Sequence, residues 1–284
     1  MRNKQVKQNI VFALLGLAAL VVLAPVVLVI GFLIAKGASA ISWEFLTQMP
    51  REGMTKGGIM PAIVGTLYLM AGTCIVSVPI GIMAAVYLTE YAGQGPLTRM
   101  VRLAIVNLAG VPSVVYGLFG LGFFIMFLHI GNGRSITAGA LTLALMTLPV
   151  VITSTEEALL TVPKSFRDGS LALGATKWTT IWRVVLPNSA AGIITGVILG
   201  VGRAAGETAP IMFTAATYFT NKLPASPSDE CMALPYHLYV LAAEGFAIPE
   251  RVQWGTAFTL LLIVLGMNLI ATVIRGRFRR ARTW

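Results

Sequence analysis

Between two long apolar segments lies the sequence STEEALLTVPKSFRDGSLALGATKWTTIWRVVLPNS, residues 154–189. Loops of this length are usually polar and irregular, but here the apolar residues recur at helical spacing. Ser154 opens an S-x-x-E capping box, and a first helix stops at Gly174, a natural left-handed C-cap. Thr176 is placed to cap a second helix, which we expect to end at Leu186-Pro187. The pattern predicts a helical hairpin with an apolar face that requires a partner or the bilayer surface.

The segments on both sides of this loop are long enough to cross a membrane. A transmembrane helix needs about 20 predominantly apolar residues. Six segments meet this condition: Ile10–Ala35, Ala62–Tyr87, Leu103–Ile130, Ile136–Thr153, Ala190–Ala216 and Trp254–Ile274. The third contains Pro112 among several glycines, so we expect it to be bent or broken there. The sequence predicts an all-α integral membrane protein with six transmembrane helices.

The composition supports this class and excludes several others. Hydrophobic residues make up 56% of the chain and charged residues 11%, and the mean hydropathy is +0.81. Soluble domains have roughly 25% charged residues. A disordered chain, a disulfide scaffold and a typical cytosolic enzyme are therefore excluded. Ile10–Ala35 is too long for the apolar core of a signal peptide, so we expect a retained first span.

The positions of the basic residues predict the orientation and explain the net charge of +10 without nucleic-acid binding. Of the 21 Lys and Arg residues, Arg203 lies within a span. With the N-terminus inside, six lie on outside segments: Lys36, Arg51, Lys56, Arg134, Lys222 and Arg251. The other fourteen lie on inside segments, including the tail at 275–284. The positive-inside rule then predicts that both termini are cytoplasmic.

The inside loop resembles the cytoplasmic EAA loop of ABC importer permeases. That pattern is E-A-A, three residues, G, nine residues, I, one residue, L-P. This chain has the same spacing, with Asp, Gly, Ser and Val substituted at four positions. In the family this loop forms coupling helices that seat on the ATP-hydrolysing subunit. The resemblance assigns ATPase coupling to Arg167, Asp168, Gly169, Ser170, Gly174, Ala175, Val184, Leu186 and Pro187.

Further segments resemble phosphate-specific ABC permeases. They are Gly57–Leu67, Pro79–Tyr91, Gly110–Gly120 and Arg203–Pro210. Met232–His237 is similar to the PstA-type rather than the PstC-type subunit. The resemblance covers about Ile41 to Arg275. It implies a type I ABC importer permease (MetI-like) fold, in which five helices form the core and the first span wraps around the partner subunit.

The same resemblance implies the partners. No G-x-x-x-x-G-K-[ST] segment occurs, so we expect no cofactor on this chain and no enzymatic activity of its own. ATP and Mg would bind to a separate PstB-type ATPase dimer. The other expected partners are a homologous PstC-type permease, a periplasmic or extracellular PstS-type phosphate-binding protein, and membrane lipid. The expected location is the bacterial inner membrane.

Two charged residues lie within the fifth predicted span, where an arginine costs about 2.5 to 3.5 kcal/mol. Arg203 and Glu207 are four residues apart and would share one helix face. They form either a self-neutralising ion pair or part of an anion path, in which the planar guanidinium would bind phosphate. Asn107, Ser113 and Tyr116 of the third span offer further donors to an anion or to neighbouring helices. His129 and His237 have no second ligand at metal spacing.

The chain divides into an N-terminal part, a permease core and a basic tail. Residues 1–58 would hold a cytoplasmic segment, the first span and an outer loop. The core is 59–274 with its coupling loop at 154–189, followed by 275–284. A permease for sulfate, molybdate, phosphonate or another polar solute is the nearest alternative. An ion-coupled secondary carrier would need repeated halves, and a membrane enzyme would need a catalytic constellation; the sequence has neither.

Overall fold

A computed structural model describes residues 2–243 and 248–280. Five of its helices are long and apolar enough to cross a membrane. Two further helices, Pro96–Ala109 and Ser113–Phe127, meet the same condition only together and are bent by 103° at the break between them, as in a broken span or a re-entrant loop. These helices confirm the all-α membrane fold. The long helices are α1 (Arg2–Gly37), α3 (Met60–Val86), α6 (Ile136–Leu160), α9 (Leu186–Ala205) and α12 (Glu250–Arg280).

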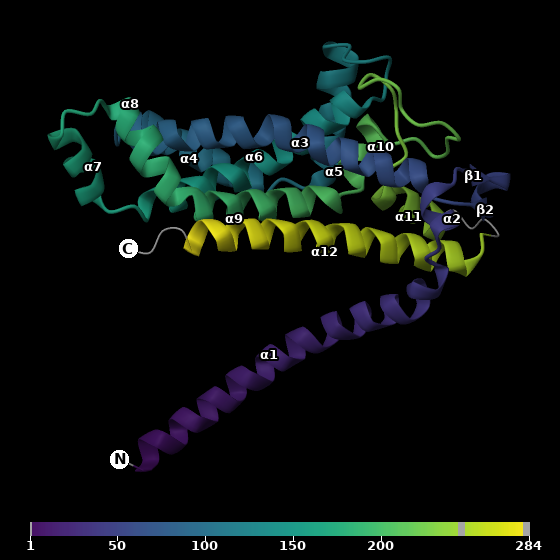
Figure 1. Cartoon of the computed structure of the whole chain (residues 1–284), viewed down its shortest axis with the longest axis horizontal. Helices are drawn as coiled ribbons and strands as arrows, with labels where there is room; N and C mark the ends of the chain where they lie inside the picture. The colour runs from purple at the N-terminus through teal and green to yellow at the C-terminus, as the bar shows by residue number, and fades with distance from the viewer. Residues whose placement is uncertain (1, 244–247, 281–284) are drawn as a thin grey trace.

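Shorter elements occupy the two ends of the bundle (Figure 1). One end carries η3 (Tyr87–Tyr91), α7 (Lys164–Ala172) and α8 (Lys177–Thr180); we call it the hairpin end. The opposite end carries η1 (Ala38–Ala40), α2 (Trp43–Thr47), β1 (Pro50–Arg51), η2 (Glu52–Met54), β2 (Lys56–Gly57) and α11 (Leu234–Ala243). The two strands pair antiparallel, with Pro50 opposite Gly57. Residues 281–284 of the predicted basic tail lie outside the described residues.

The core of the bundle is formed by α3, α6 and α9, which lie side by side. Gly192 and Gly196 of α9 face Ala158 and Ser154 of α6, and a Cβ atom at either glycine would collide with its neighbour. Small residues at four-residue intervals thus let the two backbones approach closely. This contact also corrects one prediction. Ser154 does not cap a new helix, because it lies within α6 facing Gly196, and α6 continues to Leu160.

The first helix leaves the bundle. In Figure 1, α1 diverges from α12, and the two helices meet only near the C-terminal end of α1. There Phe32 packs edge-to-face on Trp254, with ring centroids 5.1 Å apart, and Gly37 contacts Phe258 closely. No residue in the most apolar stretch of α1 is buried. A long apolar surface therefore stays uncovered in the single chain.

The expected break in the third span is confirmed. Helix α4 (Pro96–Ala109) ends before Pro112, α5 (Ser113–Gly120) begins after it, and α5 runs on into the π-helical η4 (Leu121–Phe127). The hydroxyl of Tyr116 donates to the carbonyl of Leu108 at 2.8 Å. This hydrogen bond joins the two helices across the turn and stabilises the bend.

The fifth span differs from its prediction at both ends. It does not run unbroken to Ala216, because α9 ends at Ala205 and a separate α10 (Ala209–Thr214) follows. Pro210 explains the break: it has no N–H, and inside a helix its ring would clash with the carbonyl four residues earlier. At the other end, the second loop helix does not stop at Leu186-Pro187. It continues through the π-helical η5 (Ile181–Val185) into α9, where Pro187 is tolerated in the first turn.

Candidate functional site: the α7–α8 hairpin and the end of α9

The two helices of the hairpin are joined by the predicted glycine turn. Gly174 has a φ of 82°. Its N–H donates to the carbonyl of Leu171, and the N–H of Ala175 donates to the carbonyl of Ser170. These two bonds form a Schellman motif, which ends α7. The hydroxyl of Thr176 accepts from the N–H of Thr179 at 3.2 Å and caps α8. The local sequence signals therefore produced the turn that they predicted.

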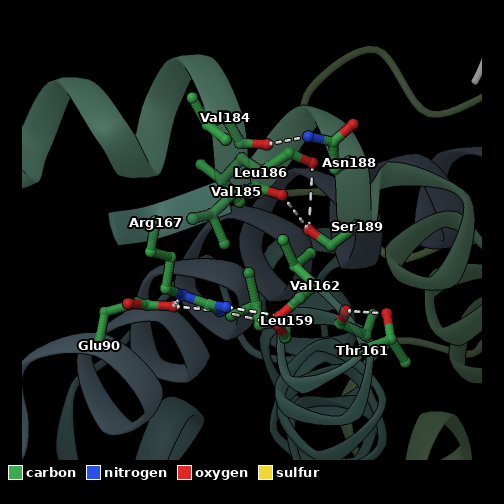
Figure 2. Close-up of polar contacts among 11 residues, drawn as sticks. Glu90, Leu159, Thr161, Val162, Arg167, Val184, Val185, Leu186, Asn188 and Ser189 are labelled. Carbon is green, nitrogen blue, oxygen red and sulfur yellow. Dashed lines mark hydrogen bonds and ion pairs between the residues drawn. The ribbon is translucent and has the colours of Figure 1, made fainter. Parts of the chain in front are cut away.

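Arg167 anchors the hairpin to the bundle (Figure 2). Its Nη2 lies 2.7 Å from Oε1 of Glu90, and its Nε donates to the same oxygen at 3.1 Å. Its Nη1 donates to the carbonyl of Val162 at 2.6 Å, and Nη2 also reaches the carbonyl of Leu159 at 2.9 Å. The side chains of Arg167 and Glu90 are only 18% and 10% exposed. One side chain thus holds together α7, the end of α6 and η3, which follows α3.

The remaining motif residues are divided between the interior and the surface. Ser170 and Thr180 share a hydrogen bond of 2.9 Å that joins α7 to α8. Val184, Leu186 and Pro187 are half-buried. The carbonyl of Val184 accepts from Asn188, and those of Val185 and Leu186 accept from Ser189, as Figure 2 shows. Asp168, Gly169 and Gly174 are exposed, whereas Ala175 is half-buried.

The outer face of the hairpin carries large uncovered apolar side chains among exposed charged ones such as Lys164 and Asp168. Leu173 next to the glycine turn is 91% exposed, and Trp178 and Trp182 are 58% and 54% exposed. The two indole rings pack edge-to-face with centroids 5.5 Å apart. Such a group of large apolar side chains at the tip of a protein marks a contact surface.

The second charged pair lies where α9 ends. Arg203 occupies the last turn of α9, and Glu207 follows the helix, so the expected shared face of one continuous helix is wrong. The pair still forms, with Nε of Arg203 3.3 Å from Oε1 of Glu207. The arginine side chain is 47% exposed and the glutamate side chain 18%. The two Nη atoms of Arg203 make no hydrogen bond within the described residues.

The structure gathers only part of the predicted path. Tyr116 is buried in the same cluster as Ala204, the neighbour of Arg203. Gly117 packs directly against Pro210, so α5 touches the segment that follows Glu207. The hydroxyl of Tyr116 is already used by the α4–α5 turn. Asn107 is exposed and Ser113 half-buried, and no hydrogen bond joins either of them to Arg203 in the part of the chain that is described.

Two contributors to these sites were missed from the sequence. Glu90 is a lone carboxylate at the end of an apolar span, a signal that indicates a buried partner. Thr180 gave no such signal. Within the described residues, no group of three or more His, Cys, Asp and Glu side chains lies close enough to hold a metal ion. His237 is buried in α11, and the same helix is anchored to α3 by the N–H of Leu234, which donates to Thr66 at 2.8 Å.

Comparison with known proteins places the whole chain among transport permeases. The family model for the binding-protein-dependent transport system inner membrane component matches residues 77–283. The phosphate transport system permease protein PstA of Mycobacterium leprae is 37% identical over 279 residues, which cover 96% of this chain and 90% of the relative. The probable ABC transporter permease protein YqgI of Bacillus subtilis (strain 168) is 32% identical, with 95% of each chain covered.

Solved structures share the fold at low sequence identity. A chain of a bacterial ABC transporter involved in the import of the acidic polysaccharide alginate superposes with a TM-score of 0.65 and 16% identity, over 96% of this chain and 98% of that chain. A chain of the inward-facing MetNI methionine ABC transporter gives a TM-score of 0.59 and 17% identity, over 78% and 97% of the two chains.

Proposed function

Because the chain belongs to the family of binding-protein-dependent transport system inner membrane components, we propose that it is the permease subunit of an ABC importer for inorganic phosphate. The family explains the helical membrane fold, and the PstA relatives support phosphate as the substrate. A permease forms no covalent bond with its substrate. It lowers the barrier for an anion to cross the membrane by exposing a polar path to one side at a time.

The proposed partners account for two uncovered surfaces. A second permease of the same family would cover the apolar flank of α1, and an ATPase would cover the tip of the hairpin around Leu173 and Trp178. ATP and Mg would bind to that ATPase, since this sequence has no phosphate-binding loop of the G-x-x-x-x-G-K type. A phosphate-binding protein would dock at the opposite end. In this arrangement the hairpin end and both termini face the cytoplasm, and the protein lies in the inner membrane.

The anchoring of the hairpin by Arg167 is the observation that carries the mechanism. A force on α7 reaches Glu90 and the Leu159 carbonyl through charge-assisted hydrogen bonds, so it acts on the ends of α3 and α6 together. Those two helices pack along their lengths in the core. ATP binding to the partner would therefore move the hairpin and the core as one body, and shift the population from inward-facing to outward-facing states.

Arg203 is the proposed anion contact on the path. Its guanidinium is half exposed and has unused donors, which suits a substrate that must bind and leave. A planar guanidinium donates two parallel hydrogen bonds to phosphate oxygens. Glu207 contacts Arg203 through one hydrogen bond of 3.3 Å. Its negative charge would lower the affinity of Arg203 for the anion.

The test separates this role from a structural ion pair. Phosphate uptake is measured in cells lacking other phosphate carriers, with membrane levels checked by blot. Arg203→Gln and the double variant Arg203→Gln with Glu207→Gln should both lose uptake at normal membrane levels, because the charge that attracts phosphate is absent from each. Arg203→Lys should fall between, since it keeps the charge and loses the fork. Arg51→Gln, an exposed change on β1, is the control and should transport normally.

Three outcomes would overturn parts of this assignment. Wild-type uptake by the double variant would leave Arg203 as a structural ion pair. Uptake that is abolished by excess sulfate or molybdate, but not by excess phosphate, would point to another oxyanion. Uptake in cells without any ATPase subunit would favour a secondary carrier.

A further inference from the structure

A polar cavity of about 760 Å³ lies at the hairpin end, beside the beginning of α4. It is lined by Leu88, Thr89, Ala92, Gly93, Gln94, Gly95, Pro96, Thr98, Arg99, Arg102 and Leu160. These residues come from η3, the turn after it, the first two turns of α4 and the end of α6. The cavity is thus separate from the outer face of the hairpin and from Arg203.

The cavity offers positive charge and hydrogen-bond donors without any acidic side chain in its lining. Arg102 is partly neutralised, because its Nη2 donates to the carbonyl of Leu88 at 2.9 Å and lies 3.3 Å from Oε1 of Glu156. Arg99 is exposed and has no acidic partner within ion-pair distance among the described residues. The hydroxyl of Thr89 is buried and has no hydrogen-bond partner there. An anion with several acceptor oxygens would pair with the two arginines, and a rotation of the Thr89 side chain would bring its hydroxyl to the same anion.

The rest of α4 indicates where such an anion comes from. This helix has no buried residue, and Leu97, Met100 and Leu103 are large apolar side chains exposed on it. A helix with basic residues on one face and apolar residues on another lies at the boundary between headgroups and acyl chains. An inorganic anion would satisfy the arginines but would make no contact with this apolar surface. A phospholipid would satisfy both.

We propose that this cavity binds the phosphate group of an anionic phospholipid headgroup, with the acyl chains along the apolar face of α4. Arg99 supplies the principal charge, and Arg102 and Thr89 complete the site. The site adjoins the coupling anchor, because Leu88, whose carbonyl holds Arg102, is two residues from Glu90. A bound lipid would therefore stabilise the element to which the hairpin is tied. The proposal depends on the membrane location of the chain and not on phosphate being the substrate.

The test uses the assembled transporter in detergent and short-chain phosphatidylglycerol as the probe, with bound lipid counted by native mass spectrometry. Phosphatidylglycerol should bind, and short-chain phosphatidylcholine should bind far more weakly. Arg99→Gln should weaken phosphatidylglycerol binding about tenfold, since one charge-assisted hydrogen bond is lost. Because the Arg99 side chain has no ion pair or hydrogen bond to any described residue, this change should leave the fold intact. Arg277→Gln removes an exposed charge near the C-terminal end of α12. This control variant should bind phosphatidylglycerol as tightly as the parent protein.

Inorganic phosphate and glycerol phosphate distinguish the source of the anion. Neither should displace phosphatidylglycerol at equal concentration, because neither covers the apolar face of α4. Displacement by inorganic phosphate would mean a site for the free anion and would overturn the lipid proposal. Equal phosphatidylglycerol binding by Arg99→Gln and the parent protein, at matched thermal unfolding midpoints, would also overturn it.

Discussion

Two of the arginine–glutamate pairs, Arg167–Glu90 and Arg203–Glu207, have surroundings that differ in every respect that matters for function. Arg167 meets Glu90 at 2.7 Å, donates to two backbone carbonyls as well, and is 18% exposed. Arg203 meets Glu207 at 3.3 Å through one nitrogen and is 47% exposed. The first pair joins residues 77 positions apart, and the second joins residues four apart.

This difference indicates what each of the two arginines does in the protein. An arginine whose three side-chain nitrogens all donate to the protein is fixed, and it transmits force between the elements that it joins. An arginine with unused donors and a half-exposed side chain can exchange its partner for a ligand. Pairing alone therefore says little about role, and the number of satisfied donors says more.

Breaking the buried pair should produce the largest effect. Arg167→Gln leaves the carboxylate of Glu90 buried without its cation, which costs about 3–5 kcal/mol when a buried pair loses one partner. We expect a lower thermal unfolding midpoint in detergent and reduced co-purification of the ATPase. Adding Glu90→Gln should restore part of the stability, because two amides can still hydrogen-bond. Lys164→Gln on the exposed part of α7 is the control. If Arg167→Gln unfolds at the same temperature as this control, the Arg167–Glu90 pair does not contribute to the stability of the fold.

The turn of the hairpin should give the second largest effect. Gly174→Val places a branched side chain at φ of 82°, where L-residues cost about 1–2 kcal/mol, although a Cβ atom there meets no neighbour. We expect the protein to insert normally and to recruit less ATPase, because the angle between α7 and α8 changes while the anchor stays. Gly276→Ala is the matched control: it lies inside α12 in open space, away from the hairpin residues assigned to coupling, and should gain about 0.5–1 kcal/mol of helix stability. Unchanged ATPase co-purification and transport in Gly174→Val would separate the hairpin from coupling.

The exposed pair should have the smallest effect on stability. Arg203→Gln should change the free energy of unfolding by under about 1 kcal/mol, since pairs that reach solvent contribute little. The measurement is the thermal unfolding used for Arg167→Gln, in the same detergent. A loss as large as that of Arg167→Gln would erase the contrast between the two arginines, and Arg203 would then be a structural residue.

Much of the architecture could be predicted from local sequence. The apolar segments predicted the membrane class, Pro112 predicted the break between α4 and α5, and Gly174 predicted the positive φ of the hairpin turn. Each of these features depends on residues that are neighbours in the chain. Length, periodicity and the steric limits of proline and glycine therefore suffice to predict them.

The tertiary structure decided the features that depend on distant residues. Ser154 has a capping-box pattern, yet it packs against Gly196 and the helix continues. Arg167 was assigned to ATPase coupling from its place in the loop, but its ion pair with Glu90 could not be predicted from the sequence. Which donors of Arg203 stay unused likewise depends on where α9 ends and on what surrounds it. Sequence alone determined which segments are helical and apolar. Packing determined which charges are satisfied, because a desolvated charge takes its partner from whatever the fold brings near.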